Sequence, residues 1–126
     1  MEDAPMANVL VVDDDADVAE LVRTVLSIAG HEVTVAADGE RGIAAASAVH
    51  PDPIVLDWMM PGMTGIEVCR TLRQDSSFDA TRIIMLTAKS APSDIDAARG
   101  AGADDYVVKP FAPRELRRRV AELLAS

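Results

Sequence analysis

The sequence predicts a single α/β domain, in which helices cover both faces of a five-stranded parallel sheet. Five short apolar runs rich in β-branched residues alternate with segments of helical period, and this alternation is typical of a parallel sheet. The chain has 126 residues, which is enough for one hydrophobic core and one domain. We therefore expect residues 1–126 to form one domain, with residues 1–6 as a flexible tail.

The five expected strands are continuous apolar runs, as is typical of strands that are buried on both faces. They lie at residues 9–12, 33–36, 54–56, 83–86 and 106–108. Each run is only three or four residues long and is followed by polar or small residues, so each predicts a short strand and not a long buried helix.

The expected helices lie between these runs, where apolar residues recur at spacings of three and four positions. The supporting residues, helix by helix, are Val18, Leu21, Val22, Val25, Leu26 and Ala29; Ile43, Ala46 and Val49; Ile66, Cys69 and Leu72; and Leu116, Val120, Leu123 and Leu124. The helix before the last strand is expected to start at Ser93, because Ser93 and Asp96 have the spacing of a capping box. It is expected to stop at Gly100 or Gly102.

Composition excludes several classes of protein. The formal net charge of −9 argues against non-specific binding to nucleic acid or to an anionic membrane, because both are polyanions. Cys69 is the only cysteine, so the chain cannot form an internal disulfide. No apolar stretch approaches the ~20 residues that span a bilayer, and the acidic start does not resemble a signal peptide. We expect a cytoplasmic protein without direct nucleic-acid or membrane contact.

The residues at the carboxyl ends of the strands carry the functional argument, because ligands of an open parallel sheet bind there. The first expected strand is followed by Asp13, Asp14 and Asp15, the third by Asp57, the fourth by Thr87 and the fifth by Lys109. The second ends in Ala36 and Ala37, which fits an edge strand away from the site. This pattern favours a flavodoxin-like sheet with the strand order 2-1-3-4-5.

Carboxylates that converge at one sheet edge predict a metal site. Two close carboxylates repel each other by about 4 kcal/mol at an effective dielectric constant of ~20, and one lysine cannot cancel three of them. Mg²⁺ can, because it binds carboxylates, waters and phosphate oxygens. We assign Asp13 and Asp14 to this ion, whereas Asp15 better suits a helix cap. A carboxylate beside the metal can attack phosphorus and form an aspartyl phosphate, while Lys109 and Thr87 stabilise the phosphoryl oxygens.

With these residues placed, the chain closely resembles the receiver domain of response regulators, over about residues 8–124. The likeness rests on the acidic run Asp13-Asp14-Asp15, the segment Asp57-Trp58-Met59-Met60-Pro61-Gly62-Met63-Thr64-Gly65, the pair Thr87-Ala88, and Lys109-Pro110-Phe111. It implies a phosphorylation-activated domain of two-component signalling. Such a domain is not an ordinary enzyme, because it catalyses only its own phosphorylation and dephosphorylation.

The resemblance also implies a role for each matching residue. Asp57 would be the phosphoacceptor, with a sensor histidine kinase or a phosphotransfer protein as the partner. The implied ligands of Mg²⁺ are Asp13, Asp14, Asp57 and the backbone carbonyl of Met59, and the implied phosphate-binding residues are Thr87, Ala88 and Lys109. Tyr106 would be a switch aromatic that turns inward as Thr87 moves toward the phosphate. The Lys109-Pro110 bond is expected to be cis, which only X-Pro bonds adopt easily.

A second set of residues resembles the branch of this family that carries winged-helix output domains. It comprises the segment Gly102-Ala103-Asp104-Asp105-Tyr106 together with Glu115 and Arg119. That branch dimerises on phosphorylation through its fourth helix, fifth strand and fifth helix. The resemblance therefore makes Asp104, Asp105, Glu115 and Arg119 candidate residues of a homodimer face, although Ile95 stands near the position of an expected basic residue.

Two further residues are expected to tune the lifetime of the aspartyl phosphate. Met59 follows Asp57 by two positions and Lys89 follows Thr87 by two, so both leave strand ends at the site. Hydrolysis requires a water in line with the Asp57 oxygen. Met59 cannot orient such a water, and Lys89 can cover the phosphate with its long stem.

Three other functions fit parts of the same sequence. Asp13 and Asp15 match the Asp-x-Asp of haloacid-dehalogenase-type phosphatases, but that assignment leaves Asp57 without a role. A flavodoxin-like electron carrier shares the fold class, yet three aspartates would repel the phosphate of its cofactor. A receiver that binds partners without being phosphorylated is the third alternative, although every key residue is present.

Overall fold

Five parallel strands form one sheet in the computed structural model, which describes residues 7–125. The strands are β1 (Asn8–Val12), β2 (Glu32–Ala36), β3 (Pro53–Asp57), β4 (Arg82–Thr87) and β5 (Asp105–Val108). Their order is β2-β1-β3-β4-β5, which confirms the predicted flavodoxin-like topology. The tail expected at residues 1–6 lies outside the described residues.

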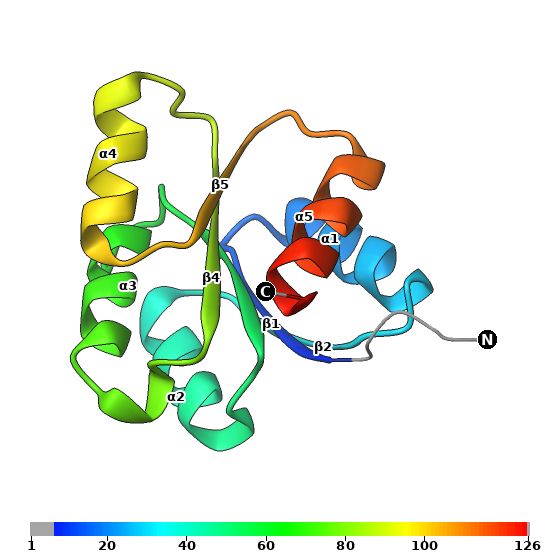
Figure 1. Cartoon of the computed structure of the whole chain (residues 1–126), viewed down its shortest axis with the longest axis horizontal. Helices are drawn as coiled ribbons and strands as arrows, with labels where there is room; N and C mark the ends of the chain where they lie inside the picture. Colours follow the sequence, from blue (N-terminus) through cyan, green and yellow to red (C-terminus); the bar gives the residue numbers. More distant parts are fainter. Residues whose placement is uncertain (1–6, 126) are drawn as a thin grey trace.

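Five α-helices of the described residues cover the sheet, two on one face and three on the other (Figure 1). They are α1 (Ala16–Ile28), α2 (Gly39–Val49), α3 (Gly65–Arg73), α4 (Pro92–Ala101) and α5 (Pro113–Ala125), with a short 3-10 helix at Ser76–Phe78. Helices α1 and α5 pack on one face, and α2, α3 and α4 pack on the other. No described helix is both long and apolar enough to cross a membrane.

The core consists of two layers, one on each side of the sheet. Along β1, Val9 and Val11 contact the layer with α1 and α5, whereas Leu10 and Val12 contact the layer with α2 and α3. Successive side chains of a strand point to opposite faces, so a strand that is covered on both faces has to be apolar at every position. This is the physical reason for the continuous apolar runs of the sequence.

Two helix starts illustrate how local signals act. Asp15 caps α1 as predicted, because its side chain accepts hydrogen bonds from the backbone N–H groups of Asp17 and Val18. The predicted start of α4 at Ser93, with Asp96 completing a capping box, is wrong. The helix begins at Pro92, where the missing N–H of proline is no loss. Asp94 accepts a hydrogen bond from the N–H of Ala91 at 3.3 Å.

The end of α4 agrees with one of the two predicted stops. The helix runs to Ala101 and ends at Gly102, whose φ of 113° lies in the left-handed region that glycine adopts without strain. The side chain of Arg73 occupies the space where a Cβ of residue 102 would lie. Glycine at this position therefore allows the left-handed backbone conformation and leaves room for the side chain of Arg73.

Strand register brings the functional strand ends to one edge of the sheet. Val12 lies beside Leu56, Asp57 lies beside Leu86, and Thr87 lies beside Val108. The residues that follow these strands therefore leave the sheet together, at the edge where the sequence places its polar residues.

Candidate metal centre

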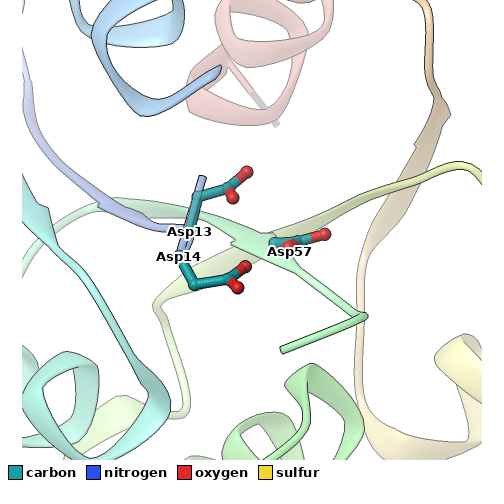
Figure 2. Close-up of side chains that lie close together, drawn as sticks. All are labelled: Asp13, Asp14 and Asp57. Carbon is teal, nitrogen blue, oxygen red and sulfur yellow. The ribbon is translucent and has the colours of Figure 1, made fainter. Parts of the chain in front are cut away.

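Asp13, Asp14 and Asp57 meet at the carboxyl ends of β1 and β3 (Figure 2). Each contributes one carboxylate oxygen to a group in which all these atoms lie within 4.8 Å of one another. Asp13 and Asp57 are 3% and 5% exposed, whereas Asp14 is exposed to solvent. The structure thus brings together the three carboxylates that the strand-end argument selects, with one side open to water.

The backbone around Asp13 holds its carboxylate in place. Its own N–H donates to the carbonyl of Ala36 at 3.1 Å, which extends the pairing of β1 with β2 by one residue. Its Oδ1 atom accepts a hydrogen bond from the N–H of Asp15 at 2.9 Å. One oxygen of Asp13 is therefore engaged by backbone, while Oδ2 faces Lys109.

Lys109 supplies a positive charge to the two buried carboxylates. Its Nζ lies 3.4 Å from Oδ2 of Asp13 and 3.4 Å from Oδ1 of Asp57. The backbone N–H of Lys109 donates to the carbonyl of Thr87 at 2.8 Å, and the Lys109-Pro110 bond is cis, as expected. One ammonium against three carboxylates leaves the cluster with an excess of negative charge.

Burial and this excess of negative charge both raise the pKa of Asp57. The pKa of Asp57 is raised from 3.8 to about 6, first because burial disfavours the ionised form and second because Asp13 carries a like charge. Lys109 acts in the opposite direction. A small cation at the cluster would favour the ionised form. The oxygen donors and the exposed side at Asp14 fit Mg²⁺, which keeps several waters when it binds carboxylates.

Met59 lies in the turn that follows β3, and the residue is 59% exposed. The turn is closed by hydrogen bonds from the N–H groups of Met60 and Gly65 to the carbonyl of Trp58, at 3.1 and 2.9 Å. The start of α3 is therefore held directly against the residue that follows β3. The role of the Met59 carbonyl as a metal ligand stays a prediction.

Thr87 ends β4 with a fully buried side chain. Its hydroxyl oxygen accepts a hydrogen bond from the N–H of Lys89 at 3.2 Å. Ala88 follows it at the surface. Because Asp57 pairs with Leu86, Thr87 and Ala88 lie one and two positions beyond the partner of Asp57 on β4. Their placement is compatible with the phosphate-binding role that the resemblance implies.

Tyr106 is buried, at 7% exposure, and its hydroxyl donates to the carbonyl of Lys89 at 2.6 Å. Its ring meets the ring of Trp58 edge to face, with centroids 6.4 Å apart. The ammonium of Lys89 lies 5.1 Å from the Trp58 ring centroid and 3.7 Å from Asp94. Sequence reasoning missed Trp58 and Asp94. The only available signal was that Trp58 adjoins Asp57.

The four candidate dimer-face residues fall into two groups. Asp105 accepts a hydrogen bond from Arg119 at 2.6 Å, and Arg119 also donates to Glu115 at 2.8 Å. These three residues join β5 to α5. Asp104 instead accepts from Arg73 at 2.9 Å and from the N–H of Ile83 at 2.8 Å, so it is bound to α3 and β4 of its own chain.

Comparison with known proteins agrees with this geometry. Residues 9–121 match the response regulator receiver domain family. The DNA-binding response regulator MtrA of Mycobacterium tuberculosis is 46% identical over 118 residues, which are 94% of this chain and 50% of MtrA. The chain therefore spans about half of the length of the curated relatives it matches. The DNA binding in that name describes the longer protein, and it agrees with the resemblance to the winged-helix branch.

Solved structures give the same result. A putative response regulator from Chloroflexus aurantiacus is 40% identical with a TM-score of 0.91, covering 97% of this chain and 100% of that one. The chemotaxis protein CheY4 of Vibrio cholerae is 37% identical with a TM-score of 0.90, covering 94% and 99%. Asp15, which the phosphatase alternative requires, caps α1 with its side chain. The chain belongs to the response regulator receiver domain family and is a receiver of two-component signalling.

Proposed function

We propose that this chain is switched by transfer of a phosphoryl group to Asp57 from a phosphohistidine of a sensor kinase or a phosphotransfer protein. One observation carries the proposal: the buried Asp57 carboxylate lies 3.4 Å from Lys109 and shares its site with two further carboxylates. Receivers of this family interact with histidine kinases and bind Mg²⁺ at an acidic pocket, and the Asp13, Asp14 and Asp57 cluster is such a pocket.

The reaction follows from the positions of these groups. A carboxylate oxygen of Asp57 attacks the phosphorus, an O–P bond forms as the P–N bond breaks, and the imidazole leaves with the electron pair and takes up a proton. Lys109 stabilises one phosphoryl oxygen. The Thr87 hydroxyl, whose oxygen accepts from Lys89, retains a proton that it can donate to another. Mg²⁺, held by Asp13, Asp14, Asp57 and the Met59 carbonyl, would supply further positive charge.

The direct test is labelling with acetyl phosphate in the presence of Mg²⁺. Asp57→Asn is expected to abolish incorporation of phosphate while keeping the fold, because it removes the nucleophile at nearly constant volume. Asp96→Asn serves as the control, since Asp96 is an exposed acid on α4 whose loss changes the net charge equally. Intact-mass spectrometry measures both variants. Equal labelling of the Asp57 variant and the parent would refute the assignment.

A structural change on phosphorylation would be transmitted from the site through Thr87 and Tyr106. Lys89 contacts both residues through its backbone, because its N–H donates to Thr87 and its carbonyl accepts from Tyr106. A shift of Thr87 toward a phosphoryl group would therefore reach β5 and the neighbouring α4. We assign partner binding or homodimerisation to this face, with the ion-paired Asp105, Glu115 and Arg119 at its α5 side.

Met59 is proposed to protect the aspartyl phosphate from hydrolysis. Its exposed apolar side chain follows Asp57 by two residues and cannot orient a water. Met59→Asn is expected to shorten the phosphorylated lifetime about two- to tenfold, because one hydrogen bond to the attacking water is worth about 0.5–1.5 kcal/mol. Dephosphorylation of the isolated chain with Mg²⁺ measures this. Met59→Leu should keep the parental lifetime of the aspartyl phosphate. A Met59→Asn variant whose aspartyl phosphate lasts as long as the parent's would contradict the role.

A further inference from the structure

Lys89 contacts four residues around the site, two through its backbone and two through its side chain. Its backbone contacts Thr87 and Tyr106, with N–H to Oγ1 at 3.2 Å and carbonyl to hydroxyl at 2.6 Å. Its ammonium lies 3.7 Å from Oδ1 of Asp94, in the first turn of α4, and 5.1 Å from the Trp58 ring centroid. The side chain of Lys89 therefore ties the residue after Asp57 to the start of α4.

The contact between Lys89 and Asp94 is only partly screened by water. The side chains of Lys89 and Asp94 are 37% and 24% exposed, and the aromatic face of Trp58 covers the ammonium from another side. Shielding of this kind makes an ion pair stronger than one at the open surface. Asp94 therefore holds the Lys89 ammonium against Trp58 in the unphosphorylated domain.

A phosphoryl group on Asp57 would offer the same ammonium a second anion. It brings a charge of roughly −1.5 to −2 to the residue directly before Trp58. The ammonium of lysine is a single point charge on a flexible stem, so two anions in different places compete for it. When the Lys89 ammonium pairs with the phosphoryl group, its ion pair with Asp94 is therefore weakened.

We propose that Lys89 is a positioning residue for which Asp94 and the phosphorylated Asp57 compete. Phosphorylation draws the ammonium away from Asp94 and Trp58, and the first turn of α4 loses its anchor to the site. Conversely, Asp94 lowers the affinity of the site for the phosphoryl group. This inference rests on the proposed function of Asp57.

Asp94→Asn isolates the charge of Asp94 from its structural role. Oδ2 of Asp94 accepts a hydrogen bond from the N–H of Ala91 at 3.3 Å, and asparagine keeps a side-chain oxygen that can accept it. The helix start is therefore preserved while the competing charge is removed. Asp96→Asn is the matched control, because it removes the same charge from the exposed side of the same helix.

The test measures the affinity of the Mg²⁺-loaded protein for beryllium trifluoride, a mimic of a phosphoryl group on a carboxylate. Asp94→Asn should bind the mimic about two- to fivefold more tightly, which corresponds to an ion pair of less than about 1 kcal/mol. Asp96→Asn should bind as the parent does. In a Lys89→Met background, which itself binds more weakly, the Asp94 substitution should have no effect.

Thermal unfolding of the same variants separates competition from a structural role. Loss of the ion pair should leave the stability of the Asp94→Asn variant unchanged or slightly lower while its affinity for the mimic rises, whereas a purely structural contact would lower both. The proposed competition would be overturned if Asp94→Asn and Asp96→Asn bound beryllium trifluoride equally well. It would also be overturned if Asp94→Asn raised the affinity by the same factor in the Lys89→Met background. A parent that binds no mimic at all would instead refute the proposed function of Asp57.

Discussion

Replacing Asp57 with asparagine is expected to stabilise the domain without bound metal at neutral pH by about 2–3 kcal/mol. The pKa of Asp57 is raised to about 6 by burial and by the charge of Asp13, so ionising it opposes folding. A shift of one pKa unit corresponds to about 1.4 kcal/mol. Asparagine keeps the volume without the charge, and Asp13 still binds Lys109 at 3.4 Å.

The sign of this effect defines its pH range. A carboxyl group whose pKa is higher in the folded than in the unfolded chain favours folding when it is protonated. Its contribution is complete below a pH of about 4 and is lost as the pH rises through about 6. The stability difference between Asp57→Asn and the parent should therefore be small at a pH of about 4 and reach its full size above a pH of about 7.

Urea unfolding at a series of pH values, with a chelator present, measures this difference. Asp96→Asn is the control for a general charge effect, and its difference from the parent should be small. Saturating Mg²⁺ should then stabilise the parent more than the Asp57 variant, because the metal favours the ionised carboxylate. A difference that does not depend on pH would mean that the charge of Asp57 is not the cause.

Gly65→Ala is expected to destabilise the domain by about 3 kcal/mol or more and to impair phosphorylation. A Cβ at residue 65 would lie 2.3 Å from the carbonyl oxygen of Asp57 and 2.8 Å from the Cα of Trp58. Both neighbours are backbone atoms, which cannot rotate away, so the loop that follows Asp57 or the start of α3 has to shift. The carboxylate of Asp57 would move with its backbone.

Gly100→Ala provides the matched control for this substitution. Gly100 lies in α4, where a Cβ would meet nothing within 4 Å. Alanine should stabilise this helix by about 0.5–1 kcal/mol, because glycine loses more conformational entropy on folding. Chemical unfolding and acetyl phosphate labelling of both variants measure the two effects. Parental stability and labelling of the Gly65 variant would show that the loop can accommodate a side chain.

The sequence was sufficient to predict the sheet and the set of residues at its edge. Strands that are covered on both faces have to be apolar throughout, so the runs at residues 9–12 and 83–86 identified strands without any tertiary information. Parallel strands end at one edge, so residues 13, 57, 87 and 109 had to lie near one another. The helix cap at Asp15 followed from a purely local signal.

The start of α4 shows where a local pattern misleads. Ser93 and Asp96 have the spacing of a capping box, but Ala91 and Asp94, two residues earlier in the chain, have the same spacing. Pro92 decides between them, because its fixed φ and missing N–H favour the first position of a helix. The backbone constraint of Pro92 therefore determines the helix start, and the capping box expected at Ser93 and Asp96 does not.

Only the tertiary structure determines which partners the charged side chains contact. Asp104, a candidate residue of the dimer face, accepts a hydrogen bond from Arg73 of its own chain, thirty-one positions away. No local pattern predicts that the ammonium of Lys89 lies between Trp58 and Asp94 in the unphosphorylated chain. The raised pKa of Asp57 likewise depends on burial and on Asp13. Electrostatic interactions depend on distance and on exposure to water, and both are set by residues far apart in the chain, so no local pattern encodes them.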